Sequence, residues 1–225
     1  FLLNGFFNRF NLEQEFALLT LREGFKFDAY TLLKGLVFAR VIEPCSKHKT
    51  NVEVLPSLFG NYSFSDHELY RGLDFLGQEH ESIIELLNYR YAKQYKRNTE
   101  NVYFDATNFY FEIDSEDELR KKGPSKENRR DPLIGMGLLL DGDQVPLAAK
   151  FFPGNESEKP VIREVISEMK QRHHITGKIV QVADKGLNST KNIVEALKNG
   201  DGYLYSQSVK MLNDVEENWV LNDND

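Results

Sequence analysis

The stretch Asn101-Val102-Tyr103-Phe104-Asp105-Ala106-Thr107-Asn108-Phe109-Tyr110-Phe111 marks a change in the sequence pattern. Its aromatic and β-branched runs, 102–104 and 109–111, are typical of strands. Residues 98–100 form a polar break before it, and upstream of the break apolar residues recur at helical spacing. The sequence therefore predicts a helical N-terminal region at 1–98 and a second region that contains strands at 99–225.

The residues before this stretch predict several helices. Ser65-Asp66-His67-Glu68 has the S-x-x-E spacing of a capping box, so a helix is expected from there to about residue 76. The segments 12–21, 27–42 and 79–97 have helical periodicity as well, and Pro44 stops the second of them. The first region is therefore expected to be all-helical.

The residues after this stretch alternate between extended and helical patterns. Residues 133–140 and 145–152 are extended apolar segments, and the turn signal between them predicts an antiparallel hairpin. The remaining expected elements are a helix at 156–171, a strand at 179–183, a helix at 188–198 and a strand at 203–206. The resulting order β, β, β, α, β, α, β predicts an α/β fold with a mixed sheet and helices on its faces.

Composition places the chain among ordinary globular proteins. Of its 225 residues 40% are hydrophobic and 28% are charged, and a chain of this length can bury a substantial core. The single cysteine, Cys45, excludes an intramolecular disulfide and suits a reducing cytosol. No apolar run approaches the length of a membrane span. We expect a cytoplasmic protein without a membrane partner and, because the chain opens at Phe1, a fragment of a longer one.

The net charge of −7 is unevenly distributed, which matters for nucleic-acid binding. Residues 112–118 are acidic, and the following stretch 120–130 is basic. The basic residues of this stretch are Arg120, Lys121, Lys122, Lys126, Arg129 and Arg130. They are candidates for contacts with DNA phosphates. The alternative is a solvated loop paired with the preceding acidic run.

Two aspartates are expected at strand ends. Asp105 follows the run 101–104, and Asp184 follows the run 179–183. Carboxylates at the carboxyl ends of neighbouring strands can share hard divalent cations such as Mg²⁺. Such cations can activate a water or hydroxyl in phosphodiester chemistry. A strand-end aspartate is, however, more often a helix cap or a turn former, so the pattern alone leaves both interpretations open.

Longer motifs around these residues favour the first interpretation. The motifs are Phe104-Asp105-Ala106-Thr107-Asn108, the segment from Gly135-Met136-Gly137-Leu138 to Phe151-Phe152-Pro153-Gly154-Asn155-Glu156-Ser157-Glu158, and Val182-Ala183-Asp184-Lys185-Gly186-Leu187-Asn188-Ser189. In this order and spacing, the chain resembles the DDE transposases of bacterial insertion sequences over about residues 40–208. The resemblance is to the group whose RNase H-like core carries a β-rich insertion before its last carboxylate.

The resemblance implies a fold, a site and partners. It implies an RNase H-like core in which Asp105 and Asp184 are the first two ligands of Mg²⁺, with Mn²⁺ as a substitute. Thr107 is then a candidate to orient the metal-binding carboxylate, unless it only caps the strand end. The implied activity is metal-dependent cleavage and transfer of double-stranded DNA at transposon ends and target, and the complete protein is compatible with a homodimer.

One part of the family pattern is missing. The third ligand of the family is a glutamate in the pattern Y-x2-R-x3-E-x6-K, which this sequence lacks. Glu195, Glu216 and Glu217 do not match it, and we expect them to be solvated carboxylates. The core is thus expected to be truncated before the third ligand and impaired in catalysis.

Two further interpretations stay open. The first is a catalytically inactive transposase remnant that retains only DNA or partner binding. The second is a phosphatase with Asp105 as nucleophile, because haloacid dehalogenase-type sites also begin with an aspartate after an apolar strand. That family has a second aspartate two positions later, where this chain has Thr107.

Overall fold

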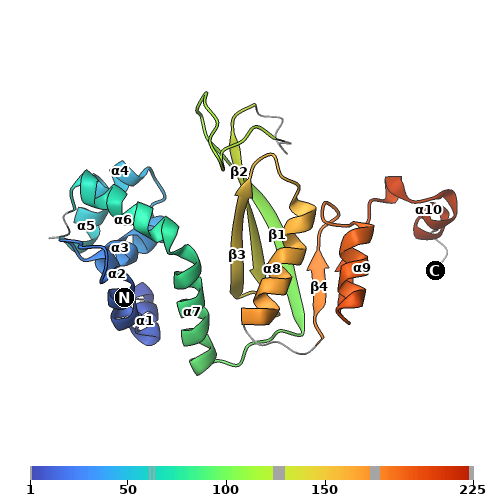
Figure 1. Cartoon of the computed structure of the whole chain (residues 1–225), viewed down its shortest axis with the longest axis horizontal. Helices are drawn as coiled ribbons and strands as arrows, with labels where there is room; N and C mark the ends of the chain where they lie inside the picture. Colours follow the sequence, from blue (N-terminus) through green and yellow to red (C-terminus); the bar gives the residue numbers. More distant parts are fainter. Residues whose placement is uncertain (1, 61, 63, 124–129, 173–177, 223–225) are drawn as a thin grey trace. The chain divides into compact units, whose positions relative to one another are not determined.

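The computed structural model describes residues 2–60, 62, 64–123, 130–172 and 178–222. The chain divides into two compact units, Phe1–Lys96 and Arg97–Asp225, which we describe separately (Figure 1). Among the described residues, no helix combines the length and the apolar character that a membrane span requires.

The first unit is helical. Its elements are α1 (Leu2–Phe10), α2 (Glu13–Thr20), α3 (Ala29–Ile42), α4 (Lys47–Lys49), the π-helix η1 (Thr50–Val54), α5 (Leu55–Phe59), α6 (Asp66–Gln78) and α7 (His80–Gln94). The predicted capping box is confirmed, since the Glu68 amide donates to Ser65 Oγ and the Ser65 amide donates to Glu68 Oε2. Asp28 caps α3 by accepting from the amides of Tyr30 and Thr31.

Aromatic side chains form much of the core of this unit. Phe16 and Phe75 are buried and meet edge to face, with ring centroids 5.9 Å apart. Gly35 allows a close approach between segments, because a Cβ there would lie 2.5 Å from the Tyr62 hydroxyl oxygen. Burial raises the pKa of this hydroxyl above its usual range.

The second unit contains a five-stranded sheet. Its strands are β1 (Asn101–Tyr110), β2 (Leu133–Leu140), β3 (Pro146–Pro153), β4 (Val180–Ala183) and β5 (Gly202–Tyr205), and its helices are α8 (Glu158–Arg172), α9 (Thr190–Lys198), the 3₁₀-helix η2 (Val209–Met211) and α10 (Asp214–Val220). The strand order is β3-β2-β1-β4-β5. The β1–β2 and β2–β3 pairs are antiparallel, whereas β4 runs parallel to both β1 and β5. The predicted α/β fold with a mixed sheet is thus confirmed.

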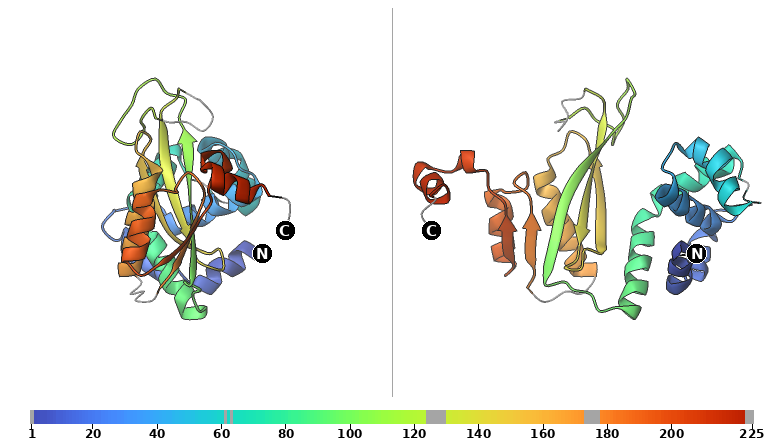
Figure 2. Two further views of the ribbon diagram at one scale, coloured as in Figure 1. Left: turned by 90° about the vertical axis from the view of Figure 1, so that its right-hand side faces the viewer. Right: turned by 180° about the vertical axis from the view of Figure 1, so that it is seen from behind.

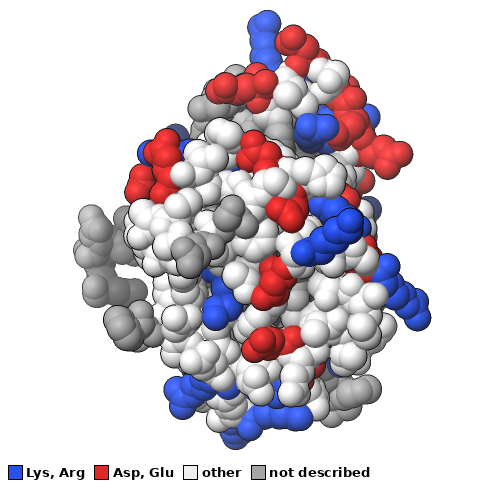
Figure 3. All heavy atoms as spheres, turned by 90° about the vertical axis from the view of Figure 1, so that its left-hand side faces the viewer, with Lys and Arg blue, Asp and Glu red and all other residues white. Residues whose placement is uncertain are grey.

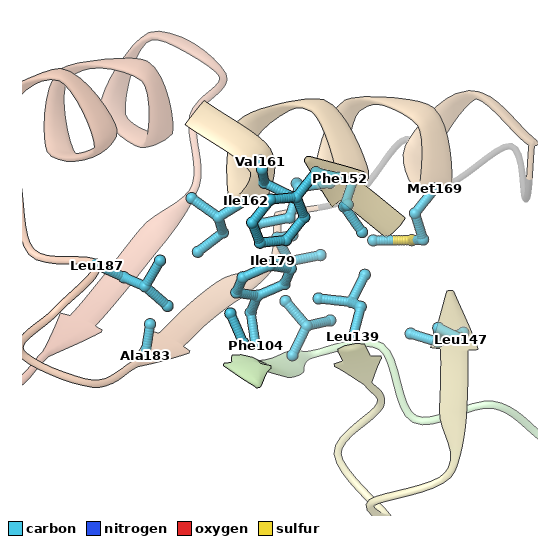
Figure 4. Packing of buried hydrophobic residues seen from close by; sticks show 14 residues of the cluster. Phe104, Leu139, Leu147, Phe152, Val161, Ile162, Met169, Ile179, Ala183 and Leu187 are labelled. Atoms are coloured by element: carbon cyan, nitrogen blue, oxygen red, sulfur yellow. The ribbon is translucent and has the colours of Figure 1, made fainter. Parts of the chain in front are cut away.

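One face of the sheet is covered by two helices. α8 packs on β2 and β3, and α9 packs on β5 and against α8. Figure 4 shows Val161, Ile162 and Met169 of α8 pointing toward Phe104 and Leu139 of the sheet, and all five are buried. In the right-hand view of Figure 2, α8 lies on the far side of the sheet from the viewer. The buried core of this unit therefore lies between the sheet and α8.

Two glycines of β2 make room for this core. A Cβ at Gly135 would lie 2.1 Å from the Phe152 ring, and a Cβ at Gly137 would lie 2.6 Å from the Phe104 ring. Any larger residue would therefore displace these aromatic rings from the space they occupy.

The predicted hairpin between β2 and β3 is confirmed. Asp141 is fully buried in its turn, where Oδ1 accepts from the amides of Asp143 at 3.0 Å and Val145 at 2.9 Å. Its Oδ2 forms an ion pair with Arg97 Nη1 at 2.8 Å. A buried ion pair thus joins the start of this unit to the hairpin turn.

Two features differ from the sequence analysis. The prediction that Asp105 closes its strand is wrong, because β1 continues to Tyr110 with β2 as its partner through residues 106–108. No helix was expected from the sequence at the residues of α1, α4, η1, α5, η2 or α10. Pairing with β2 overrides the weak strand signal between the two aromatic runs of β1.

Candidate functional site

The parallel pairing of β1 and β4 brings the two predicted aspartates together. In this register Phe104 is the partner of Ala183, the last residue of β4. Asp105 directly follows Phe104, and Asp184 directly follows Ala183. Because the two strands are parallel, both aspartates lie one residue further in the same direction. The carboxyl end of β4 therefore lies beside the middle of β1, with one aspartate on each.

Buried and exposed side chains alternate along the first part of β1, and this alternation decides which face of the sheet carries the site. Val102, Phe104 and Ala106 are buried beneath α8, whereas Asp105 and Thr107 are exposed and point to the opposite face. Asp184 is exposed as well. Both carboxylates are therefore accessible to solvent at the sheet surface.

Backbone amides orient both carboxylates. Asp105 Oδ1 accepts from the Ala106 amide at 2.8 Å. Asp184 Oδ1 accepts from the amides of Gly186 at 2.9 Å and Leu187 at 3.3 Å. Asp184 thus organises the loop between β4 and α9, as a turn-forming aspartate does, and its carboxylate is held in one orientation by the same contacts.

The donor set fits a hard divalent cation in part. Two adjacent exposed carboxylates offer the oxygen ligands that Mg²⁺ prefers, and solvent exposure leaves room for the waters that it retains. Among the described residues, however, no group of three or more His, Cys, Asp or Glu side chains is placed to hold a metal ion. The described residues therefore place two carboxylates, and no third His, Cys, Asp or Glu side chain, together at this position.

The other acidic candidates lie elsewhere. Glu195 is on α9 and lines a groove with Arg163 of α8. Glu216 belongs to the capping box of α10, because its Oε2 accepts from the Asn213 amide, and Glu217 follows it in that helix. In the described part of the chain, none of the three joins Asp105 and Asp184 in a metal-ligating group.

The described start of the basic stretch 120–130, called the basic segment below, is attached to one end of the sheet at residues 121–123. Lys121 forms a bridge with Leu133 at the start of β2, and the Gly154 amide at the end of β3 donates to the Leu119 carbonyl. Gly123 packs so closely on Gly154 that a Cβ there would lie 1.9 Å from the Gly154 carbonyl oxygen. Since β1, β3 and β4 are parallel, this is the end of the sheet toward which β4 and Asp184 point.

Part of this segment pairs with the acidic run before it. Arg120 Nη2 lies 2.5 Å from Asp117 Oδ2, and the Arg120 side chain holds the pKa of that carboxyl below its usual value. The Lys122 amide donates to Glu116 Oε1 at 2.5 Å. Arg130 is exposed. Lys126 and Arg129, also predicted to contact DNA, lie outside the described residues.

The charged side chains are mixed over the face in Figure 3, where Lys and Arg lie among Asp and Glu without forming one continuous basic area.

One contact near the site is not predicted by the sequence. Asn192 of α9 is buried, and its Nδ2 donates to the Leu187 carbonyl oxygen at 2.7 Å. The signal available in the sequence is a polar residue four positions before Ala196 in the buried stripe of α9.

Comparisons with known proteins find similarity among solved structures. No family model matches the sequence, and no curated protein is significantly similar to it. A piggyBac transposase synaptic complex with hairpin DNA is similar in structure over 79% of this chain and 40% of that one, with a TM-score of 0.47 and 12% identity. Mos1 transposase in a paired-end complex with the left transposon end is similar over 80% of this chain and 60% of that one, with a TM-score of 0.34 and 8% identity. These similarities are too low to carry an argument about function.

Proposed function

We propose that the chain is the core region of an insertion-sequence DDE transposase of bacterial type, which acts in metal-dependent DNA strand cleavage and transfer. The observation that carries this proposal is the pairing of Phe104 with Ala183, which sets Asp105 beside Asp184. The two aspartates come from the two motifs that resemble the family's metal ligands, and a position on neighbouring strands is one that a shared cation requires.

In this proposal Asp105 and Asp184 hold Mg²⁺, or Mn²⁺ in its place. The bound cation would activate the attacking oxygen and stabilise the leaving oxygen of a phosphodiester. The amides of Gly186 and Leu187 fix the orientation of the Asp184 carboxylate. Thr107 lies on the same face of β1, about 7 Å along the strand from Asp105, where it would support the site or the phosphate near it.

The proposed partner is double-stranded DNA, both transposon ends and target, and the complete protein would act as a homodimer. The basic segment supports this partner, because Lys121 is fixed at the end of the sheet toward which Asp184 points. Arg120 is the weakest of these candidates, since Asp117 already neutralises it.

Metal binding tests the site directly. Mn²⁺ is titrated into the chain, and free Mn²⁺ is followed by its electron paramagnetic resonance signal. We expect millimolar binding that Asp105→Asn and Asp184→Asn each abolish, because one carboxylate alone is a poor site. Glu195→Gln is the matched control, and it should bind Mn²⁺ as the parent does. Equal binding by the parent and Asp105→Asn would contradict the proposal.

One observation favours a second candidate, a transposase remnant without strand cleavage. Within the described ranges, Asp105 and Asp184 have no third metal-ligating partner. The two candidates differ in their effect on supercoiled plasmid DNA in the presence of Mn²⁺. Nicking that Asp184→Asn removes supports the transposase core, whereas DNA binding without nicking supports the remnant.

A further inference from the structure

The loop from Asp184 to Ser189 positions a carboxylate of the proposed site. Two amides of this loop, those of Gly186 and Leu187, donate to Asp184 Oδ1. The direction of the carboxylate therefore depends on where the peptide groups of this loop lie. A side chain that fixes the backbone of this loop therefore also fixes the orientation of the Asp184 carboxylate.

The buried side chain of Asn192 binds the backbone of this loop. Its side chain is 1% exposed, and its Nδ2 donates to the Leu187 carbonyl oxygen at 2.7 Å. Its Oδ1 accepts from Arg163 Nη1 of α8. The buried amide thus uses both its donor and its acceptor side, once toward the loop and once toward the neighbouring helix.

Arg163 is fixed in turn by α8. Its Nη1 also donates to the Lys159 carbonyl oxygen at 3.3 Å. The adjacent residue Ile162 and the next turn's Ile166 are buried in the core under this helix. The contact from Arg163 therefore ties the loop to α8, which has five buried residues.

Helix capping does not account for Asn192. Ser189 is the N-cap of α9, and its Oγ accepts from the Asn192 backbone amide at 3.2 Å. An apolar residue at position 192 would fill the same space without the cost of burying an amide. The polar side chain is explained by its hydrogen bond to the Leu187 peptide.

We propose that Asn192, braced by Arg163, is a positioning residue that sets the orientation of the Asp184 carboxylate through the Leu187 peptide. The proposal rests on the proposed function in so far as Asp184 is a metal ligand. Residues that orient a ligand from behind typically change metal affinity by about 10- to 100-fold when they are replaced.

Substitutions at position 192 separate the two hydrogen bonds. Asn192→Asp keeps an acceptor for Arg163 but replaces the donor that faces the Leu187 carbonyl oxygen. We expect the Kd for Mn²⁺ to rise about tenfold in this variant. Arg163→Lys keeps a cationic donor toward Asn192 and should weaken Mn²⁺ binding less than Arg163→Met does.

A second buried polar group provides the matched control. Asp201 is 4% exposed, pairs with Lys170 of α8 at 2.5 Å and accepts from Gln181 Nε2 at 3.3 Å. Asp201→Asn removes a buried charge from the same side of the sheet, and no hydrogen bond described for Asp201 involves the Asp184 loop. It should lower the melting temperature at least as much as Asn192→Asp and leave the Kd for Mn²⁺ within about twofold of the parent value.

Amide hydrogen exchange without metal gives an independent measurement. The amides of Gly186 and Leu187 should exchange faster in Asn192→Asp than in the parent, and at the parent rate in Asp201→Asn. Unchanged exchange of these amides, or a parental Kd for Mn²⁺ in Asn192→Asp, overturns the positioning role. If the parent itself binds no Mn²⁺, the proposed function fails, and the exchange rates alone decide the positioning role.

Discussion

At the scale of single residues, the Asp184 carboxylate leaves little room for a side chain at position 186. A Cβ at position 186 would lie 3.2 Å from Asp184 Oδ1, which is tighter than ordinary contact. We expect Gly186→Ala to weaken Mn²⁺ binding several-fold, because the carboxylate must turn away, while stability changes by less than about 1 kcal/mol at this exposed position. Titration with Mn²⁺ and thermal melts measure the two effects.

The control for this variant is Gly77→Ala in α6, where a new Cβ would meet nothing within 4 Å. It should stabilise the chain by about 0.5–1 kcal/mol, as expected for a helical glycine, and leave Mn²⁺ binding unchanged. Parental Mn²⁺ affinity in Gly186→Ala would show that Asp184 tolerates displacement.

Tyr205 makes stability depend on alkaline pH. The pKa of Tyr205 is raised to about 12, chiefly by burial; the nearby Arg163 lowers it and Asp201 raises it. Because this pKa lies above the unfolded value of about 10, its contribution to stability is complete below pH 10 and is lost as the pH rises from about 10 to 12. Tyr205→Phe should therefore flatten the pH dependence of stability in this window.

At neutral pH the same variant should lose about 1 kcal/mol, because the Tyr205 hydroxyl donates to Gln181 Oε1 at 2.7 Å. Tyr203→Phe is the control, since Tyr203 is 42% exposed on the same strand. Chemical denaturation at several pH values compares the variants. If the stability of Tyr205→Phe falls with pH as steeply as that of the parent, other groups cause the loss of stability at alkaline pH.

At the scale of elements, the β2–β3 hairpin depends on the buried pair of Arg97 and Asp141. Arg97→Met leaves the fully buried Asp141 carboxylate without its cation, which should cost about 3–5 kcal/mol. Arg120→Met also breaks an ion pair, but that pair is exposed, so its loss of stability should be much smaller. If denaturation experiments show equal losses of stability in Arg97→Met and Arg120→Met, burial does not make the Arg97–Asp141 pair more important than the exposed pair.

At the scale of the whole molecule, the uneven charge distribution predicts how DNA binding responds to salt. If the basic segment contacts phosphates, Lys121→Ala with Lys122→Ala should weaken binding about equally for all sequences. The slope of log K against log salt should flatten by about 0.9 per lost contact. Replacement of both lysines by arginine keeps the charge and should keep the slope. An unchanged slope in the alanine variant would leave the segment as a solvated loop.

Much of the fold followed from local patterns. The helices around Ser65 and the strands of the β2–β3 hairpin were predictable, because periodicity, capping and turn residues act over a few positions. The extent of β1 was not, because residues 106–108 become strand only through pairing with β2. α10 was missed as well, although Asn213 and Glu216 form a capping box in its first turn.

The sequence by itself determined the order of the five strands with α8 and α9, and the two aspartate motifs, since both depend on residue type and short spacing. Only the tertiary structure decided that β4 ends beside the middle of β1, so that Asp105 and Asp184 are neighbours. It also decided that Asn192 contacts the loop of Asp184. The physical reason is that strand register and buried hydrogen bonds join residues far apart in the chain, and these pairings are selected by packing of the whole unit.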